Sequence, residues 1–272
     1  MGYNGGVKKT AFRKKILDYY RAHRRDFPWR NTRNPYHILV SEIMLQQTQA
    51  SRVVSKYTEF LVRFPTVEAL AEASTRDVLG VWKGLGYNRR ALALKRAAES
   101  IVRDHRGRVP KDFDALVALP GIGPATAGDI LAFAWNIPTT VIETNIRTVY
   151  IHFFFPHKKN VHDRDIIPLI KETMSTDNPR EWYSALMDYG AMLKQTNNAS
   201  RRSAHYMRQS PFKGSNRELR SRILDTLMRK PSTTATLART LTQTPDALTK
   251  NLTTLTREGF ICKDTRGVYR VV

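Results

Sequence analysis

Apolar residues recur with a helical period through most of this chain, and no other feature constrains its fold as strongly. From Thr10 to about Leu193, successive segments place apolar side chains three or four positions apart, as in RALALKRAAESIVRDH and EWYSALMDYGAMLK. No alternating apolar and polar run, the pattern of a half-buried strand, interrupts them. The sequence therefore predicts an all-α fold here, with residues 41–64, SEIMLQQTQASRVVSKYTEFLVRF, forming one of the helices.

The last part of the chain has a different pattern. A polar, basic stretch, residues 194–216, reads as a connecting loop and leads to three short helical segments, the third beginning at Thr244-Pro245 and ending at Gly259. Residues 260–272 then predict a short hairpin. Three helices and a two-stranded wing are typical of winged helix-turn-helix domains. We predict a helical domain at residues 1–213 and a winged-helix-like α+β domain at residues 214–272, which contacts DNA or, alternatively, another protein.

The charge of the chain predicts an anionic partner. The sequence holds 45 Lys and Arg against 24 Asp and Glu, a formal net charge of +21, which is typical of nucleic-acid-binding proteins. It has no apolar run of about 18 residues and no signal peptide. Cys262 is the one cysteine, which excludes a disulfide within the chain and a cysteine-ligated zinc site or cluster. We expect a soluble monomer on double-stranded DNA, cytoplasmic and nucleoid-associated or nuclear, and not at a membrane.

The segment LPGIGPATA, residues 119–127, predicts a tight turn into a helix. Its glycines allow close approach of the backbone to another group. Amides at the start of the helix can bind a phosphate oxygen without reading the base sequence. In a chain of this charge we interpret the segment as DNA-binding, with an ordinary interhelical turn as the alternative. The candidate residues are Gly121, Ile122, Gly123 and Thr126.

LPGIGPATAG resembles the helix-hairpin-helix of the DNA glycosylase superfamily that includes endonuclease III and the adenine glycosylase MutY. Four further segments resemble MutY in the same order, over about residues 26–194: FPWRNTRNPYHILVSEIMLQQTQASRV, FLVRFPTVEALAEAS, VWKGLGYNRRALALKRAA and ALMDYGAML. The resemblance implies two helical lobes around a catalytic cleft into which the target nucleotide is flipped. It also implies a potassium or sodium ion on the backbone carbonyls of Val117, Leu119 and Ile122.

Two carboxylates receive catalytic roles from this resemblance. Base removal needs an acid for the leaving base and a negative charge near the cation-like sugar. Glu42 matches the acid of MutY that protonates adenine at N7, and Asn145 matches a family asparagine. Glu143 stands where the family has aspartate, and its extra methylene can move the carboxylate by up to about 1.5 Å. Glu143 therefore fills the aspartate role from an adjusted backbone, indicates another substrate, or is an ordinary helix-start carboxylate.

Ala125 replaces the residue that decides strand cleavage. Bifunctional relatives carry a lysine there, whose amine attacks the sugar, so the resemblance implies simple hydrolysis that leaves an abasic site. The resemblance further implies that Gln47 is the wedge beside the flipped nucleotide. It places five other residues at the base pocket: Trp29, Arg30, Tyr87, Asn88 and Asp188. A core tryptophan and a surface aspartate are the ordinary alternatives at 29 and 188.

Several features depart from the MutY pattern. The segment directly after DYGAML, KQTNNASRRSAHYMRQ, contains no cysteine, so we expect no iron–sulfur cluster. Basic side chains would make any DNA contacts of that segment: Lys194, Arg201, Arg202 and Arg208. Asn88 replaces an aromatic residue that intercalates beside oxidised guanine. The winged-helix-like part stands where MutY has its 8-oxoguanine-recognising domain. Three histidines, at 152, 157 and 162, have a loose metal-like spacing without matching carboxylates, and we expect no metal site there.

The predicted function is hydrolytic removal of a mispaired base, with adenine opposite 8-oxoguanine or guanine as the first choice. A glycosylase for thymine or uracil in mismatches, or for another lesion, is the second. A non-catalytic DNA-binding protein is the third. Glu42 argues against the third, because a carboxylate in a cationic binding surface would repel phosphate.

Overall fold

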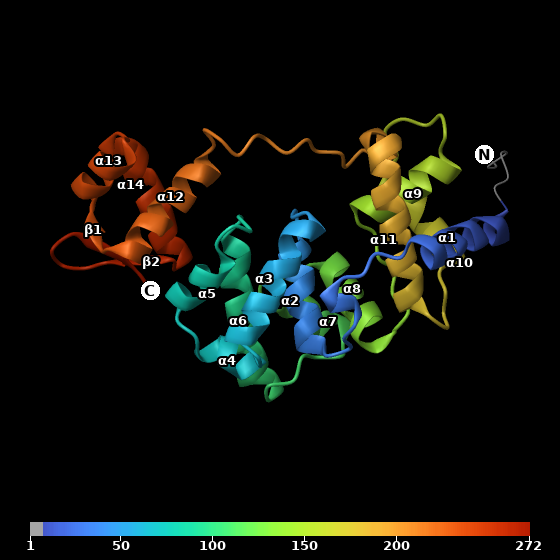
Figure 1. The fold of residues 1–272 in the computed structure, drawn as a ribbon, viewed down its shortest axis with the longest axis horizontal. Helices are drawn as coiled ribbons and strands as arrows, with labels where there is room; N and C mark the ends of the chain where they lie inside the picture. The colour runs from blue at the N-terminus through green and yellow to red at the C-terminus, as the bar shows by residue number, and fades with distance from the viewer. Residues whose placement is uncertain (1–7) are drawn as a thin grey trace. The chain divides into compact units, whose positions relative to one another are not determined.

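The computed structural model describes residues 8–272, and Figure 1 labels its helices and strands. The chain divides into two compact units. The first unit comprises the described residues up to Glu42 and residues 110–118 and 122–208. Its elements are α1 (Lys9–His23), η1 (Pro28–Arg30), most of α2 (Pro35–Leu45), α7 (Phe113–Ala118), α8 (Pro124–Trp135), α9 (Thr144–Phe154), α10 (Asp163–Thr173), α11 (Pro179–Thr196) and η2 (Ala199–Arg202).

The second unit comprises residues 43–109, 119–121 and 209–272. Its elements are the end of α2, α3 (Ala50–Arg63), α4 (Val67–Glu72), α5 (Thr75–Trp82), α6 (Arg89–His105), α12 (Asn216–Arg229), β1 (Ser232–Thr233), α13 (Thr234–Leu241), α14 (Pro245–Glu258), β2 (Ile261–Lys263) and β3 (Val268–Val271). The predicted fold class, helical with a small C-terminal sheet, is confirmed.

The core of the first unit forms where α11 packs against α1, α8 and α9. Phe12 of α1 is fully buried among aromatic rings of two other helices, and its ring centroid lies 5.4 Å from that of Tyr150 and 5.9 Å from that of Trp182. Such tilted and edge-on arrangements are the preferred geometries of aromatic pairs. These three helices therefore form a rigid support for the residues that begin α9.

Gly190 of α11 allows α11 and the start of α9 to approach closely. A Cβ atom at this position would lie 2.4 Å from the carbonyl oxygen of Asn145 and 2.7 Å from its Cβ. Any larger residue would push these helices apart. The packing of α11 thus positions the first residues of α9.

α2 and α3 are separate helices, so the prediction of one helix over residues 41–64 is wrong. Gln47 adopts a left-handed conformation with φ +54° between them. Arg90 of α6 donates from Nη1 to the carbonyl oxygens of Ile43 at 2.9 Å and Met44 at 2.7 Å, which are among the carbonyls that the end of α2 leaves unpaired. Its Nη2 donates to Thr48 Oγ1 at 2.9 Å. The Arg90 side chain, 42 to 47 residues away in the sequence, thus stabilises the break between α2 and α3.

Replacing Arg90 by methionine is expected to lower the free energy of unfolding by about 3–5 kcal/mol, because it leaves several buried carbonyl oxygens without a donor. Arg90→Lys should recover part of this loss, since an ammonium group supplies three donors. Urea unfolding followed by circular dichroism measures both. Arg103→Met, on the exposed end of the same helix, is the control and should change stability by less than about 0.5 kcal/mol. Equal midpoints for the Arg90 and Arg103 variants would contradict this role.

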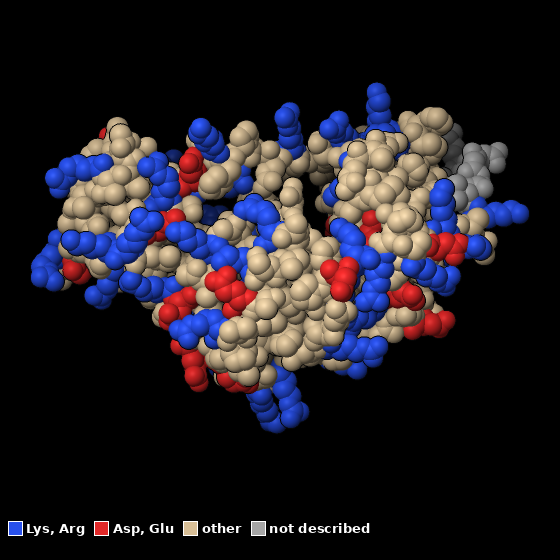
Figure 2. Space-filling view, viewed as in Figure 1, with Lys and Arg blue, Asp and Glu red and all other residues tan. Residues whose placement is uncertain are grey.

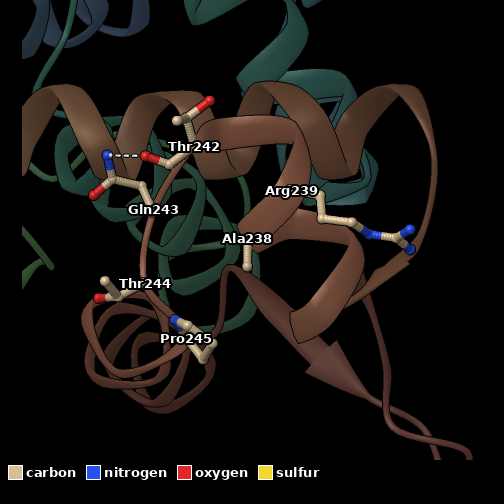
Figure 3. Close-up of a pocket in the computed structure, with 6 residues that line it drawn as sticks. All are labelled: Ala238, Arg239, Thr242, Gln243, Thr244 and Pro245. Atoms are coloured by element: carbon tan, nitrogen blue, oxygen red, sulfur yellow. Dashed lines mark hydrogen bonds between the residues drawn. The ribbon is translucent and has the colours of Figure 1, made fainter.

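The C-terminal residues form three helices and an antiparallel sheet with strand order β1-β3-β2. Thr242 ends α13 in a left-handed conformation, and the Thr244 hydroxyl caps α14 by accepting from the Ala247 amide. Figure 3 shows the pocket at this turn, which is lined by Ala238, Arg239, Thr242, Gln243, Thr244 and Pro245. The predicted helices and hairpin are confirmed, and the two-residue strand β1, too short to recognise in the sequence, adds a third strand.

The segment predicted as a loop from residue 194 is ordered at its start. α11 continues to Thr196, and η2 follows, with Ala199 and Ser200 buried. Val161 pairs with Ser203 in an isolated parallel bridge. The polar composition of this segment did not indicate the packing, because most hydrogen bonds of the segment are made by its backbone, which is the same for every sequence.

On the surface shown in Figure 2, Lys and Arg are more frequent than Asp and Glu and occur in many places between other residues. This follows from the formal net charge of +21. In the part of the chain that the structure describes, no helix is long and apolar enough to cross a membrane.

Candidate active site

Glu42 is a carboxyl group within a helix that is otherwise almost entirely apolar on its buried side. Its neighbours Val40, Ile43 and Met44 are fully buried, and Glu42 itself is 9% exposed. The pKa of Glu42 is raised to about 8, because burial and, to a smaller extent, the negative charge of Glu143 raise it more than the charge of Arg30 lowers it. At neutral pH Glu42 therefore holds a proton, as an acid that protonates a leaving group must.

Glu143 lies directly before α9 and caps this helix. Its Oε1 accepts from the backbone amides of Asn145 at 2.7 Å and Ile146 at 3.0 Å, and its Oε2 accepts from Asn145 Nδ2 at 3.3 Å. Three N–H donors and the positive end of the α9 dipole thus lie at this carboxyl group. The side chain thus folds back onto the start of its own helix. Glu143 therefore caps α9, as in the ordinary alternative, and its charge also acts on Glu42, so that its role in catalysis stays a prediction.

Lys194 lies half-buried near the end of α11, where the sequence suggested a loop in contact with DNA. Burial lowers the pKa of Lys194, while the charge of Glu143 partly opposes this effect. It follows Gly190 by one helical turn, on the side of α11 that meets Asn145. Lys194 thus supplies a positive charge near Glu143.

Asp129 of α8 is a third buried carboxyl group, which the sequence reasoning missed. It is 6% exposed, and its Oδ1 has no hydrogen-bond partner among residues 8–272. Burial raises the pKa of Asp129 well above its ordinary value, and the charges of Glu42 and Glu143 add to this effect. The sequence holds a signal that could have identified this residue, because Asp129 is the one charged residue in the apolar segment GDILAFAW. We refer to Glu42, Asp129 and Glu143 as the carboxyl cluster.

Asp188 is 2% exposed and binds two arginines rather than lying on a helix surface. Its Oδ2 and Oδ1 accept from Arg30 Nη1 at 2.7 Å and Nη2 at 2.8 Å, and its Oδ1 also accepts from Arg25 Nε at 2.6 Å. Burial opposes ionisation, but the bonds and charges of both arginines hold the pKa of Asp188 below its ordinary value. Asp188 therefore positions Arg30, whose charge acts on Glu42.

Trp29 packs in the core of the first unit. It is 6% exposed and stacks on Phe27, with ring centroids 4.8 Å apart and planes at 14°. This fits the ordinary alternative for a tryptophan in a helical protein. A role of Trp29 at the base pocket stays a prediction.

Three predicted DNA-facing residues belong to the second unit. Gln47 is exposed at the turn between α2 and α3, as a wedge residue has to be. Tyr87 has a left-handed backbone with φ +49°, and its hydroxyl accepts from Arg217. Asn88 is half-buried at the start of α6. The contact with Arg217 was not foreseeable, because 130 residues separate the partners.

The turn before α8 has the geometry that the sequence predicted. Gly121 has φ +78°, and a Cβ there would lie 2.6 Å from that of Ala93, so only glycine fits. Gly123 is the residue before α8, and it offers no side-chain cap to this helix. Ala125 is exposed in that turn and Thr126 half-buried. A phosphate contact here stays a prediction.

The monovalent ion on the carbonyls of Val117, Leu119 and Ile122 also stays a prediction. Leu119 and Ile122 are buried through their side chains, at 4% and 5% exposure. From residue 8 onward, no group of three or more His, Cys, Asp and Glu residues could hold a metal ion.

The chain is similar to known DNA repair proteins. Residues 40–167 match the HhH-GPD superfamily of base excision DNA repair proteins. The adenine DNA glycosylase of Mycobacterium tuberculosis is 36% identical over 233 residues, 78% of this chain and 77% of that protein. That of Buchnera aphidicola subsp. Baizongia pistaciae is 34% identical over 188 residues, 67% of this chain, and the match spans only 53% of its own length.

A solved structure of a thermostable thymine-DNA glycosylase is also similar. It superposes with a TM-score of 0.60 and 29% sequence identity, over 68% of this chain and 86% of that chain. The range that matches the family model, residues 40–167, includes Glu42, Asp129 and Glu143. The chain therefore belongs to the HhH-GPD superfamily of base excision DNA repair proteins, in which its sequence relatives are adenine DNA glycosylases.

Proposed function

We propose that this protein is a monofunctional DNA N-glycosylase of base excision repair that removes adenine opposite 8-oxoguanine or guanine. One observation carries the proposal. Two neighbouring carboxyl groups have opposite environments, since burial keeps a proton on Glu42 while three N–H donors surround Glu143. Pairs of carboxyl groups with such separated environments are typical of enzymes that cleave glycosidic bonds.

In the proposed reaction, Glu42 donates its proton to the base as the N-glycosidic bond breaks and the bonding electrons leave with the base. The sugar becomes cation-like at its anomeric carbon, and the negative charge of Glu143 stabilises it. A water molecule then adds to this carbon and releases a proton. General acid catalysis of this kind contributes about 10²–10⁴-fold to a rate.

Ala125 supports hydrolysis without strand cleavage. Its methyl group carries no amine, so this position of α8 cannot form a Schiff base with the sugar. The expected product is an abasic site in an intact strand.

The proposed partner is double-stranded DNA, bound by a monomer inside the cell and away from membranes. A formal net charge of +21 and the tight turn at Gly121 before α8 support binding to phosphates. We further propose that the protein works without an iron–sulfur cluster, since its sequence has one cysteine.

Removal of thymine or uracil from mismatches is the second candidate. The likeness to a thymine-DNA glycosylase structure favours it. Asn88, in place of an intercalating aromatic residue, weakens the case for 8-oxoguanine in the opposite strand.

Single-turnover base release from four duplexes separates these candidates: adenine opposite 8-oxoguanine, adenine opposite guanine, thymine opposite guanine and uracil opposite guanine. We expect release of adenine from the first two, with strand breaks only after alkali treatment. Breaks without alkali would contradict the monofunctional reaction. Release from the thymine or uracil duplexes alone would establish the second candidate, and release from none, with tight binding to all, would identify a DNA-binding protein without this activity.

A further inference from the structure

Asp129 has no role in the reaction described above, although it belongs to the carboxyl cluster. It lies on α8, four residues after Ala125. Residues four apart on a helix lie one above the other on the same face. Asp129 therefore lies one helical turn after the exposed Ala125, on the same face of α8. Bifunctional relatives carry the attacking lysine at the position of Ala125.

The protein itself does not satisfy the hydrogen-bonding capacity of Asp129. Its Oδ1 is buried and has no partner in the described part of the chain. The titratable groups that face it are Glu42 from α2, Glu143 from the start of α9 and Tyr183 from α11. The Tyr183 hydroxyl is already occupied, because it donates to the Thr139 carbonyl and accepts from the Val141 amide.

The positively charged side chains near the carboxyl cluster act on Glu42 and Glu143 rather than on Asp129. Arg30 is bound to Asp188 and acts on Glu42, and Lys194 and Arg147 lie near Glu143. Burial and two neighbouring acidic groups therefore act on Asp129 in the same direction, raise its pKa well above the ordinary value and favour its protonated form. A neutral carboxyl group is both a hydrogen-bond donor and an acceptor.

We propose that Asp129 is a specificity-determining residue that pairs with the edge of the flipped base through its carboxyl group, as donor and acceptor at once. The inference rests on the proposed function. Adenine has the matching pattern, because its N6 amino group donates and the adjacent ring nitrogen N1 accepts. The buried carboxyl oxygen of Asp129 that has no hydrogen-bond partner in the described part of the free protein gains one when adenine enters. A base analogue that lacks the matching group leaves the Asp129 carboxyl group incompletely hydrogen-bonded.

Single-turnover release of adenine and of purine, which lacks the amino group, tests this proposal with the same opposite base. Asp129→Ala should slow adenine release by about 10–100-fold and purine release by less than about threefold. Asp129→Asn should stay within about threefold of the wild type on adenine, since an amide also donates and accepts. Asp114→Asn, at an exposed aspartate of α7, is the matched control and should change neither rate.

Equal slowing of adenine and purine by Asp129→Ala would overturn the proposal, because the residue would then act through Glu42 or Glu143. No slowing of either would also overturn it. If the wild type releases no base, the proposed function fails. The affinity for adenine and purine duplexes then tests the role of Asp129 instead. In a Glu42→Gln background, Asp129→Ala should then weaken binding of the adenine duplex at least fivefold more than binding of the purine duplex, and equal weakening would reject the proposal.

The melting temperature gives a test of the neutral state without DNA. Because the folded-state pKa of Asp129 is raised, the wild type loses stability as pH rises from the ordinary aspartate value toward the raised one. Asp129→Asn lacks this loss. Its melting temperature relative to the wild type should therefore increase from pH 5 to pH 8, and a difference that does not change with pH would show that Asp129 is not a buried unpaired acid.

Discussion

Replacing Glu42 by glutamine is expected to slow base release by about 10²–10⁴-fold while leaving DNA affinity within about threefold of the wild type. Glutamine has nearly the same shape and retains an acceptor oxygen, but it has no proton to give to the leaving base. Single-turnover kinetics measure the rate, and fluorescence anisotropy measures the affinity. Glu72→Gln, at an exposed glutamate of α4, should behave as the wild type.

The pH dependence of the wild type tests the same assignment. The acid form of Glu42 is the active one, and its pKa is raised to about 8. The rate should therefore hold through neutral pH and fall about tenfold per pH unit above about 8. A rate that rises through this range, or a Glu42→Gln variant with wild-type activity, would show that Glu42 is not the acid.

Replacing Glu143 by glutamine is expected to slow base release by about 10²–10³-fold, because the negative charge that stabilises the cation-like sugar is lost. The glutamine oxygen can still accept from the amides of Asn145 and Ile146, so the cap of α9 is kept. The free energy of unfolding should change by less than about 1 kcal/mol. Glu143→Ala loses the charge and the cap together and should cost about 0.5–2 kcal/mol more in stability.

The glutamine variant should also shift the alkaline limb of the pH–rate profile. Because the charge of Glu143 raises the pKa of Glu42, its removal lowers that pKa and moves the limb to lower pH. A capping residue without a catalytic role would shift the limb in the same way, because its charge acts on Glu42, but would leave the rate at neutral and lower pH in place in Glu143→Gln. Activity of Glu143→Ala close to that of the wild type would contradict the role in the reaction.

Most helices, the C-terminal hairpin and the family were predictable because their signals are local. Apolar residues three or four apart identify a helix wherever it packs, and Thr244, Pro245 and Gly259 mark the ends of α14 within the segment itself. The resemblance that named Glu42 and Glu143 likewise depends on short, contiguous motifs. The domain boundary after residue 213 and the phosphate contact at α8 stay predictions.

What only the tertiary structure decided depends on partners that are distant in the sequence. Arg90 ends α2 from 46 residues away in the sequence. Asp188 binds Arg30 across 158 residues, and the fold thus buries an aspartate for which a helix surface was the ordinary alternative. Asp129 has no motif, and its chemistry comes entirely from the carboxyl groups that the fold brings to it. From the sequence alone came the helices, the family and the two catalytic candidates. The protonation states came from the fold, because burial and neighbouring charges set a pKa and no local pattern records them.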